Sequence, residues 1–142
     1  MPEQDLIRFL EAQNQMYLTA LEEVKKGSKK SHWMWFVFPQ LKGLGSSETA
    51  WHFGIKGINE ARLYFEHPVL GRHLIEISKA LLQVKGKTAL AIFGSPDDMK
   101  LRSCMTLFAS LEKSDPVFLS VLQHYFDGKP DPLTLSLLEK NY

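Results

Sequence analysis

A set of helix-start signals in the C-terminal half of the chain constrains the fold most strongly. The segments GSPDD, KSDPVF and GKPDPLTL each place Ser or Asp directly before a proline. Ser and Asp cap the free amide groups of a helix N-terminus, and proline suits the first helical position because no N–H is needed there. Apolar residues at three- and four-residue steps follow each signal. We therefore predict helices capped by Ser95, Asp115 and Asp131.

The same helical periodicity fills most of the remaining sequence. Apolar residues mark one helix face from about Asp5, a plausible N-cap, to Lys26, and another from Val69 to Val84. NEARLYFEHP and TALAIFG fit shorter helices, closed by a proline and a glycine. Only WMWFVF is apolar enough for a buried strand, and periodicity alone does not separate that strand from a buried helical turn.

These patterns predict an all-α protein with about seven to nine helices and no sheet. The length of 142 residues fits one domain that spans 1–142, and no linker or internal repeat divides it. The hydrophobic content of 44% and charged content of 23% are typical of globular proteins.

Composition excludes several classes of function. A formal net charge of +1 and the lack of a binding motif argue against a nucleic-acid partner. The longest apolar run, residues 33–38, is too short to cross a bilayer, and the N-terminus does not resemble a secretory signal. The lone Cys104 and the scattered histidines argue against a disulfide or a zinc site. We expect a cytoplasmic protein with no membrane association, no metal and no cofactor.

The segment KKGSKKSHWMWFVFPQLKGLG, residues 25–45, is the main candidate for a binding site. It combines cations, aromatic rings, a histidine and an amide: Lys29, Lys30, His32, Trp33, Trp35 and Gln40. Such a set suits a nucleotide, because the ring stacks on the base, the amide reads its edge and the cations meet phosphate. The alternative is a core segment, with the lysines at the solvated end of the preceding helix.

A second candidate is Gln13, which lies on the apolar face of the first predicted helix. A buried amide is costly unless it is hydrogen-bonded. Either Gln13 ties helices together in the core, or it lines the same cavity as Gln40.

Polar residues also concentrate in SPDDMKLRSCMTLF and at the last helix start. The candidates there are Asp98, Lys100, Arg102, Ser103, Thr106 and Asp131. Asp98 and Arg102 have the spacing of a helical ion pair, and a helix start can bind an anion. The alternatives are a solvated helix surface and, for Asp131, a capping role that explains it fully. Cys104 lies on the apolar face and is expected to be an inert core thiol.

Three strings, KKSHWMWFVFPQLKGLG, FGSPDDMKLRSCMTLF and YFDGKPDPLTLSLL, resemble the bacterial domain-of-unknown-function family 1810 (DUF1810), sometimes mislabelled calpastatin. The resemblance runs from RFLEAQNQMYLTAL to the final leucines. It implies a compact multihelical fold with central buried helices. The family's usual pattern has a serine at the position of Cys104, which weakens any nucleophilic role for this thiol.

That fold is distantly similar to the NADAR superfamily, whose members are linked to NAD and ADP-ribose metabolism and some of which cleave N-glycosidic bonds. The likeness implies an enzyme that binds or hydrolyses an ADP-ribose- or NAD-like N-glycoside. Asp98 or Asp131 would then be the catalytic carboxylate. The NADAR motifs are not visible in this chain, so no catalytic residue carries over. The alternatives are a non-catalytic nucleotide- or protein-binding module and an oligomer contact through exposed aromatics; the sequence does not give the oligomeric state.

Overall fold

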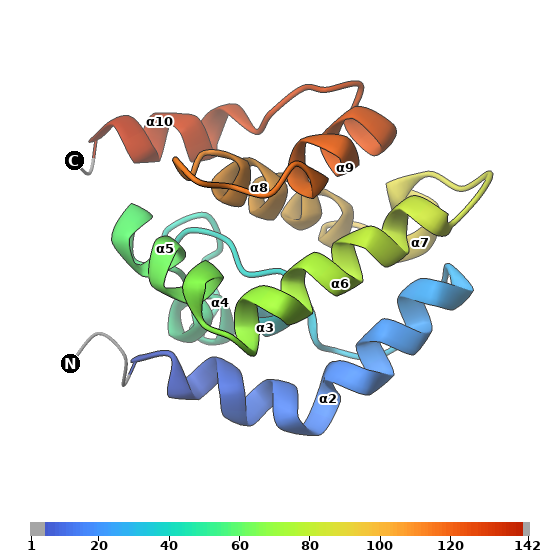
Figure 1. Cartoon of the computed structure of the whole chain (residues 1–142), viewed down its shortest axis with the longest axis horizontal. Coiled ribbons are helices and arrows are strands. Elements are labelled where there is room, and N and C mark those ends of the chain that lie inside the picture. Colours follow the sequence, from blue (N-terminus) through green and yellow to red (C-terminus); the bar gives the residue numbers. More distant parts are fainter. Residues whose placement is uncertain (1–4, 141–142) are drawn as a thin grey trace.

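The computed structural model describes residues 5–140, and all regular elements in that range are helices (Figure 1). They are α2 (Ile7–Lys26), α3 (Met34–Val37), α4 (Glu48–Phe53), α5 (Ile58–Glu66), α6 (Leu70–Gln83), α7 (Ala89–Phe93), α8 (Asp97–Ala109), α9 (Val117–Phe126) and α10 (Pro132–Lys140). A single parallel bridge between Leu41 and Ile55 is the one β-type pairing in the described residues. The predicted all-α class is confirmed.

Most of the predicted helix ends agree with the structure. Gly27 ends α2 in the left-handed conformation, with φ of 72°. Asp115 Oδ1 accepts a hydrogen bond from the Val117 amide at 2.8 Å, and Asp131 Oδ2 accepts one from the Thr134 amide at 3.1 Å. The predicted cap of α10 is therefore confirmed, whereas Pro116 occupies the N-cap position of α9 and Asp115 bonds the first helical amide from one residue earlier.

The predicted caps of α8 and α2 are wrong. Residue Pro96, not Ser95, occupies the N-cap position of α8, and no side chain caps that helix. Leu6 holds the equivalent position in α2, while the Asp5 carboxylate lies 2.7 Å from Lys56 Nζ. A nearby ammonium competes for an acidic side chain, which a local capping pattern does not show.

The ambiguous WMWFVF segment contains a short helix, α3, rather than a strand. The chain leaves helical geometry at Phe38, with φ of −122° and ψ of 70°. Pro39 explains this ending, because its ring crowds the helical conformation of the preceding residue.

The helices are arranged in layers around α8. Figure 1 shows α2 along the lower edge, α6 across the middle, and α8, α9 and α10 above it. Helix α8 packs against α5, α7, α9 and α10, and is buried on most of its circumference. Its Cys104 thiol is fully buried, and burial raises the pKa of that thiol well above its usual value. The expectations of a central buried helix and an inert cysteine agree with this packing.

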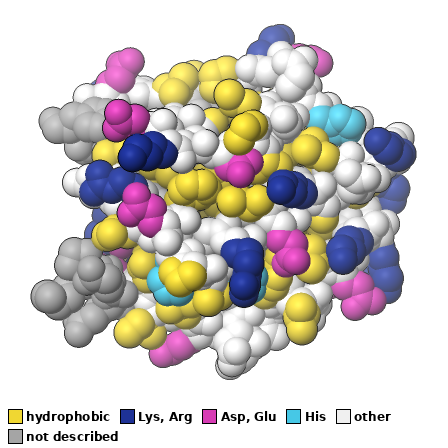
Figure 2. Space-filling view, viewed as in Figure 1, with side chains coloured by type: hydrophobic (Ala, Val, Ile, Leu, Met, Phe, Trp, Pro, Cys, Tyr) yellow, Lys and Arg dark blue, Asp and Glu magenta, His cyan; other side chains and the backbone are white. Residues whose placement is uncertain are grey.

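The surface carries no large patch of one charge on the face that Figure 2 shows, where basic and acidic side chains are interspersed. This mixture agrees with the net charge of +1. None of the helices in residues 5–140 is both long enough and apolar enough to cross a membrane.

Candidate functional site

One hollow brings together four residues that the sequence singled out. The hollow has a volume of about 450 Å³ and lies among the segment after α3, the first half of α8 and the start of α10. The four residues are Gln40, Lys100, Ser103 and Asp131. We call this space the Gln40–Asp131 hollow. An amide, an ammonium, a hydroxyl and a carboxylate therefore border one space.

The Asp131 carboxylate is held firmly by one of its oxygens. Oδ2 accepts hydrogen bonds from Ser103 Oγ at 3.1 Å, from Thr134 Oγ1 at 2.6 Å and from the Thr134 amide at 3.1 Å. The residue is only 8% exposed. Within residues 5–140, no group donates a hydrogen bond to the other oxygen, Oδ1. The carboxylate thus has a fixed orientation and one oxygen with spare capacity.

Arg102 and Thr106 fix the segment that leads into Asp131. The Arg102 guanidinium donates to the carbonyl oxygens of Lys129 and Pro130, each at 2.9 Å. The Thr106 hydroxyl oxygen accepts from the Asp131 amide at 2.8 Å. Neither residue lines the Gln40–Asp131 hollow. These hydrogen bonds position Asp131, and a ligand in this hollow would not contact Arg102 or Thr106 directly.

Asp98, the other candidate carboxylate, is not among the residues that line the hollow. Its Oδ1 is buried and has no hydrogen-bond partner in the described part of the chain. The predicted ion pair between Asp98 and Arg102 is absent there, because the arginine reaches toward α10 instead. The two candidate carboxylates therefore do not face one ligand.

Lys100 lines the hollow and also contacts Trp35, which does not line it. Lys100 Nζ lies 5.1 Å from the centroid of the Trp35 ring, within the range of a cation–π contact. A smaller cavity of about 10 Å³ adjoins the hollow and shares Gln40 and Lys100 with it, and Trp35 also lines this cavity. The Trp35 Nε1 group is buried and has no acceptor among the described residues. Trp35, unlike Trp33, is therefore next to Gln40.

Gln13 and Trp33 lie in the core, and neither lines the hollow. The Gln13 amide donates to Phe36 O at 2.7 Å and to Tyr64 Oη at 2.9 Å, and its oxygen lies 2.8 Å from His73 Nδ1. Trp33 is fully buried, and its Nε1 donates a hydrogen bond to Glu23 Oε1 at 2.8 Å. The expectation that Gln13 and Gln40 line one cavity is wrong; the amide of Gln13 joins helices, because its hydrogen-bonding groups have protein partners.

The predicted basic lip is also separate from the hollow. Lys29 is an internal ion-pair residue: its Nζ lies 2.9 Å from Asp97 Oδ2, and its side chain is 8% exposed. Lys30 and His32 are exposed and do not line the hollow. The structure therefore provides no cationic lip made from Lys29, Lys30 and His32, and Lys100 is the cation at the site.

The loop that completes the hollow was missed by sequence reasoning. Gly45, Ser46 and Ser47 form part of the wall, and Leu133 closes another side. A Cβ atom at Gly45 would lie 2.6 Å from the Ala50 Cβ, so the loop packs against α4 at a distance that only glycine permits. The glycine- and serine-rich string GLGSS was the available signal, since such strings mark loops and close backbone approaches.

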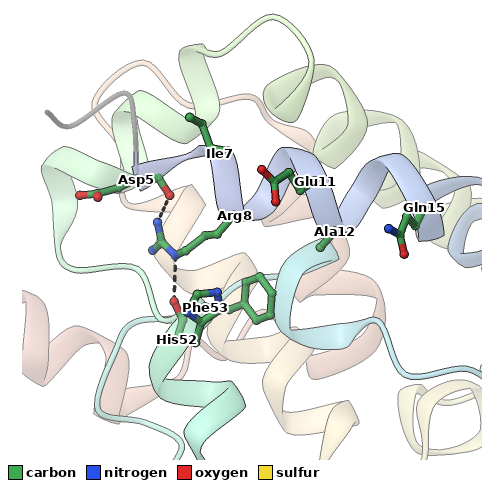
Figure 3. Close-up of a pocket in the computed structure, with 8 residues that line it drawn as sticks. All are labelled: Asp5, Ile7, Arg8, Glu11, Ala12, Gln15, His52 and Phe53. Carbon is green, nitrogen blue, oxygen red and sulfur yellow. Dashed lines mark hydrogen bonds between the residues drawn. The ribbon is translucent and has the colours of Figure 1, made fainter.

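Two other hollows do not bring together the candidate residues that the sequence predicted. The one in Figure 3, about 550 Å³, lies between α2 and α4, and its Arg8 guanidinium already donates to His52 O at 2.8 Å and to Glu60 Oε1 at 2.9 Å. Another of about 510 Å³ lies beside Arg62 and Phe65 and is bordered by charges of both signs. The Gln40–Asp131 hollow is the strongest candidate because Lys100 Nζ on its wall donates no hydrogen bond to the described residues, whereas Arg8 is already hydrogen-bonded.

Comparisons with known proteins place the chain in a family. The family model DUF1810, described as a protein of unknown function, matches residues 3–138. The crystal structure of the conserved hypothetical protein Rv1873 from Mycobacterium tuberculosis has 46% sequence identity and a TM-score of 0.93, and the match covers 95% of this chain and 96% of that chain. A search of curated proteins gives no significant match. Neither match names a ligand, an activity or the NADAR superfamily. The chain belongs to the DUF1810 family.

Proposed function

We propose that the Gln40–Asp131 hollow binds a small, nucleotide-like N-glycoside, such as ADP-ribose or an NAD-derived molecule, and hydrolyses its glycosidic bond. The observation that carries this proposal is the convergence of Gln40, Lys100, Ser103 and Asp131 on one space. The volume of about 450 Å³ fits the usual range for small-molecule sites. The resemblance to NADAR proteins inferred from the sequence favours the same class of ligand.

The reaction needs a carboxylate beside the sugar, and Asp131 supplies one. As the C1′–N bond breaks, its electron pair leaves with the base and C1′ gains oxocarbenium character. Asp131 Oδ1 faces this charge and takes a proton from the water that adds to C1′; that proton then passes to solvent when the base leaves neutral, as nicotinamide does, or to the base when it leaves as an anion. Ser103 and Thr134 hold Oδ2 and keep the carboxylate in place. The Gln40 amide, beside Trp35, contacts the leaving base.

Calorimetric titration with ADP-ribose, NAD and related nucleotides tests binding, and chromatography of the released base tests hydrolysis. We expect saturable heat with at least one member of this panel, followed by slow release of its base. The absence of heat across the panel, with a cooperative unfolding transition showing that the protein is folded, would overturn the proposal.

A second candidate function is binding without catalysis. The favouring observation is that Asp131 already has a structural role, because its Oδ2 caps α10 through Thr134. Exposed apolar side chains at the hollow, Met99 at 46% and Leu133 at 66%, would suit a protein partner or a base. This alternative predicts that a bound nucleotide is recovered unchanged, and that the Asp131→Asn variant behaves as the wild type does.

A further inference from the structure

We propose that Lys100 is a specificity-determining residue that selects ligands carrying a phosphate group, and that this phosphate lies at the Trp35 side of the hollow. The inference rests on the proposed function, because it names the class of ligand for the same site. It depends on two observations that play no part in the proposed reaction at Asp131. Within the described residues, one is a lysine charge that no carboxylate fully neutralises, and the other is a pair of hydrogen-bond donors without acceptors.

The charge imbalance involves two lysines and a single carboxylate. Asp97 Oδ2 lies 2.9 Å from Lys29 Nζ, whereas Asp97 Oδ1 lies 3.7 Å from Lys100 Nζ. The first distance is that of a charge-assisted hydrogen bond, and the second is too long for one. Asp97 therefore neutralises Lys29 first, and the three groups together retain one positive charge.

Limited solvent access makes this charge effective. The side chains of Lys29, Asp97 and Lys100 are only 8%, 19% and 20% exposed. Salt and water screen such partly buried charges less than surface charges. The unneutralised ammonium belongs to Lys100, and that residue lines the hollow. A ligand anion would supply the missing partner.

Unmet hydrogen bonds point to the same chemistry. Lys100 Nζ donates no hydrogen bond to any of residues 5–140, and its long contact with Asp97 is its one ion pair there. The nearby Trp35 Nε1 is a buried donor without an acceptor in the same range. Phosphate suits such a place because its several oxygens accept hydrogen bonds, directly or through one water in the small adjoining cavity.

Asp131 determines which way round the ligand lies. Its carboxylate borders the same hollow and its Oδ1 receives no hydrogen bond from the described residues. A phosphate beside it would be repelled, whereas a ribose hydroxyl or a positively charged glycosidic centre would be attracted. The phosphate therefore lies against Lys100, and the sugar faces Asp131.

The test compares two matched pairs of probes, adenosine 5′-monophosphate with adenosine and ribose 5-phosphate with ribose. Titrations are followed by the indole N–H signal of Trp35 in NMR spectra, assigned with a Trp35→Phe variant. We expect the wild type to bind the phosphorylated member of at least one pair about tenfold more tightly, the effect of one charge-assisted hydrogen bond. Lys100→Met should bring that ratio close to one, and Lys100→Arg should retain most of it.

A matched control and a second variant protect the test against misfolding. Lys79→Met alters an exposed lysine on α6 and should leave the ratio unchanged. Asp97→Asn removes the carboxylate that partly neutralises Lys100, so it should raise the preference for phosphate. The opposite signs of these effects at Lys100 and Asp97 do not follow from a general loss of structure.

The following results of these titrations would overturn the inference. Equal binding of both members of each pair by the wild type, or an unchanged ratio in Lys100→Met, would show that Lys100 does not select phosphate, while the proposed binding function would stand. Failure of both phosphorylated probes to bind would also overturn it. If ADP-ribose and NAD then fail as well, the proposed function fails with it.

Discussion

The hydroxyl of Ser103 donates a hydrogen bond of 3.1 Å to Oδ2 of Asp131, a residue 28 positions later in the chain. This bond joins the middle of the buried helix α8 to the start of α10. Thr106, one turn further along α8, bonds the Asp131 amide. The position of the carboxylate is therefore set by a central helix, which gives a site better geometric precision than an unsupported loop would.

Replacing Asp131 by Asn should separate catalysis from capping. Asn caps helices about as well as Asp, so we expect the free energy of unfolding to change by less than about 1 kcal/mol. Hydrolysis of the N-glycoside should fall by roughly a hundredfold or more, because an amide cannot accept the water's proton. Urea denaturation and the rate of base release measure the two effects. The matched control is Asp115→Asn at the start of α9; equal activity in both variants would contradict a catalytic Asp131.

Replacing Gly45 by Ala should distort the wall of the hollow. The new methyl group would lie 2.6 Å from the Ala50 Cβ, so the loop must move. We expect a loss of about 1–3 kcal/mol in stability and weaker ligand binding. Adding Ala50→Gly removes the clash and should restore part of both losses, which a double-mutant cycle measures. Strictly additive effects would contradict direct contact between the two positions.

Local patterns predicted the helices because their causes are local. The proline-marked starts before Val117 and Pro132 and the Gly27 stop depend on neighbouring residues alone. The capping pattern fails at Asp5 because the ion pair of this residue with Lys56 joins positions 51 residues apart. Capping rules contain no information about such distant partners.

The site was predicted only in part, for a similar reason. Sequence reasoning found Gln40, Lys100, Ser103 and Asp131 as polar residues in unusual places, and the fold brings these four together. Gln13 was a further candidate, because its place on an apolar helix face predicts burial but does not identify its hydrogen-bond partners. Those partners belong to α3, α5 and α6, so only the packed structure distinguishes a core amide from a ligand-binding one.

Replacing Gln13 by Ala should therefore reduce stability and leave ligand binding intact. The change leaves Phe36 O, Tyr64 Oη and His73 Nδ1 without the amide, and we expect a loss of about 3 kcal/mol in the free energy of unfolding. Gln40→Ala should instead weaken ligand binding and change the free energy of unfolding little. Chemical denaturation and titration of both variants measure this contrast. A selective loss of affinity in Gln13→Ala would show that this amide does reach the ligand.

The last prediction concerns Glu23, which holds the turn after α2 in place. Its carboxylate accepts hydrogen bonds from the Lys30 amide at 2.8 Å, from Ser31 Oγ at 2.6 Å and from Trp33 Nε1 at 2.8 Å. Burial raises the pKa of Glu23, but these hydrogen bonds outweigh burial and lower that pKa from 4.5 to about 2. The folded state therefore keeps the charge at a pH where the unfolded state has already taken up a proton.

Because the pKa of Glu23 is lower in the folded state than in the unfolded state, acid removes the stabilisation that its carboxylate provides. The stabilisation from Glu23 is complete above pH 4.5 and is lost as the pH falls toward about 2. Glu23→Gln should cost about 2 kcal/mol at pH 7, because it replaces charge-assisted hydrogen bonds, and the cost should shrink across that acidic range. Urea denaturation at pH 7, 4 and 3 measures the difference. Glu22→Gln, at a neighbouring exposed carboxylate, is the control, and a Glu23→Gln cost that stays constant with pH would contradict the charged role.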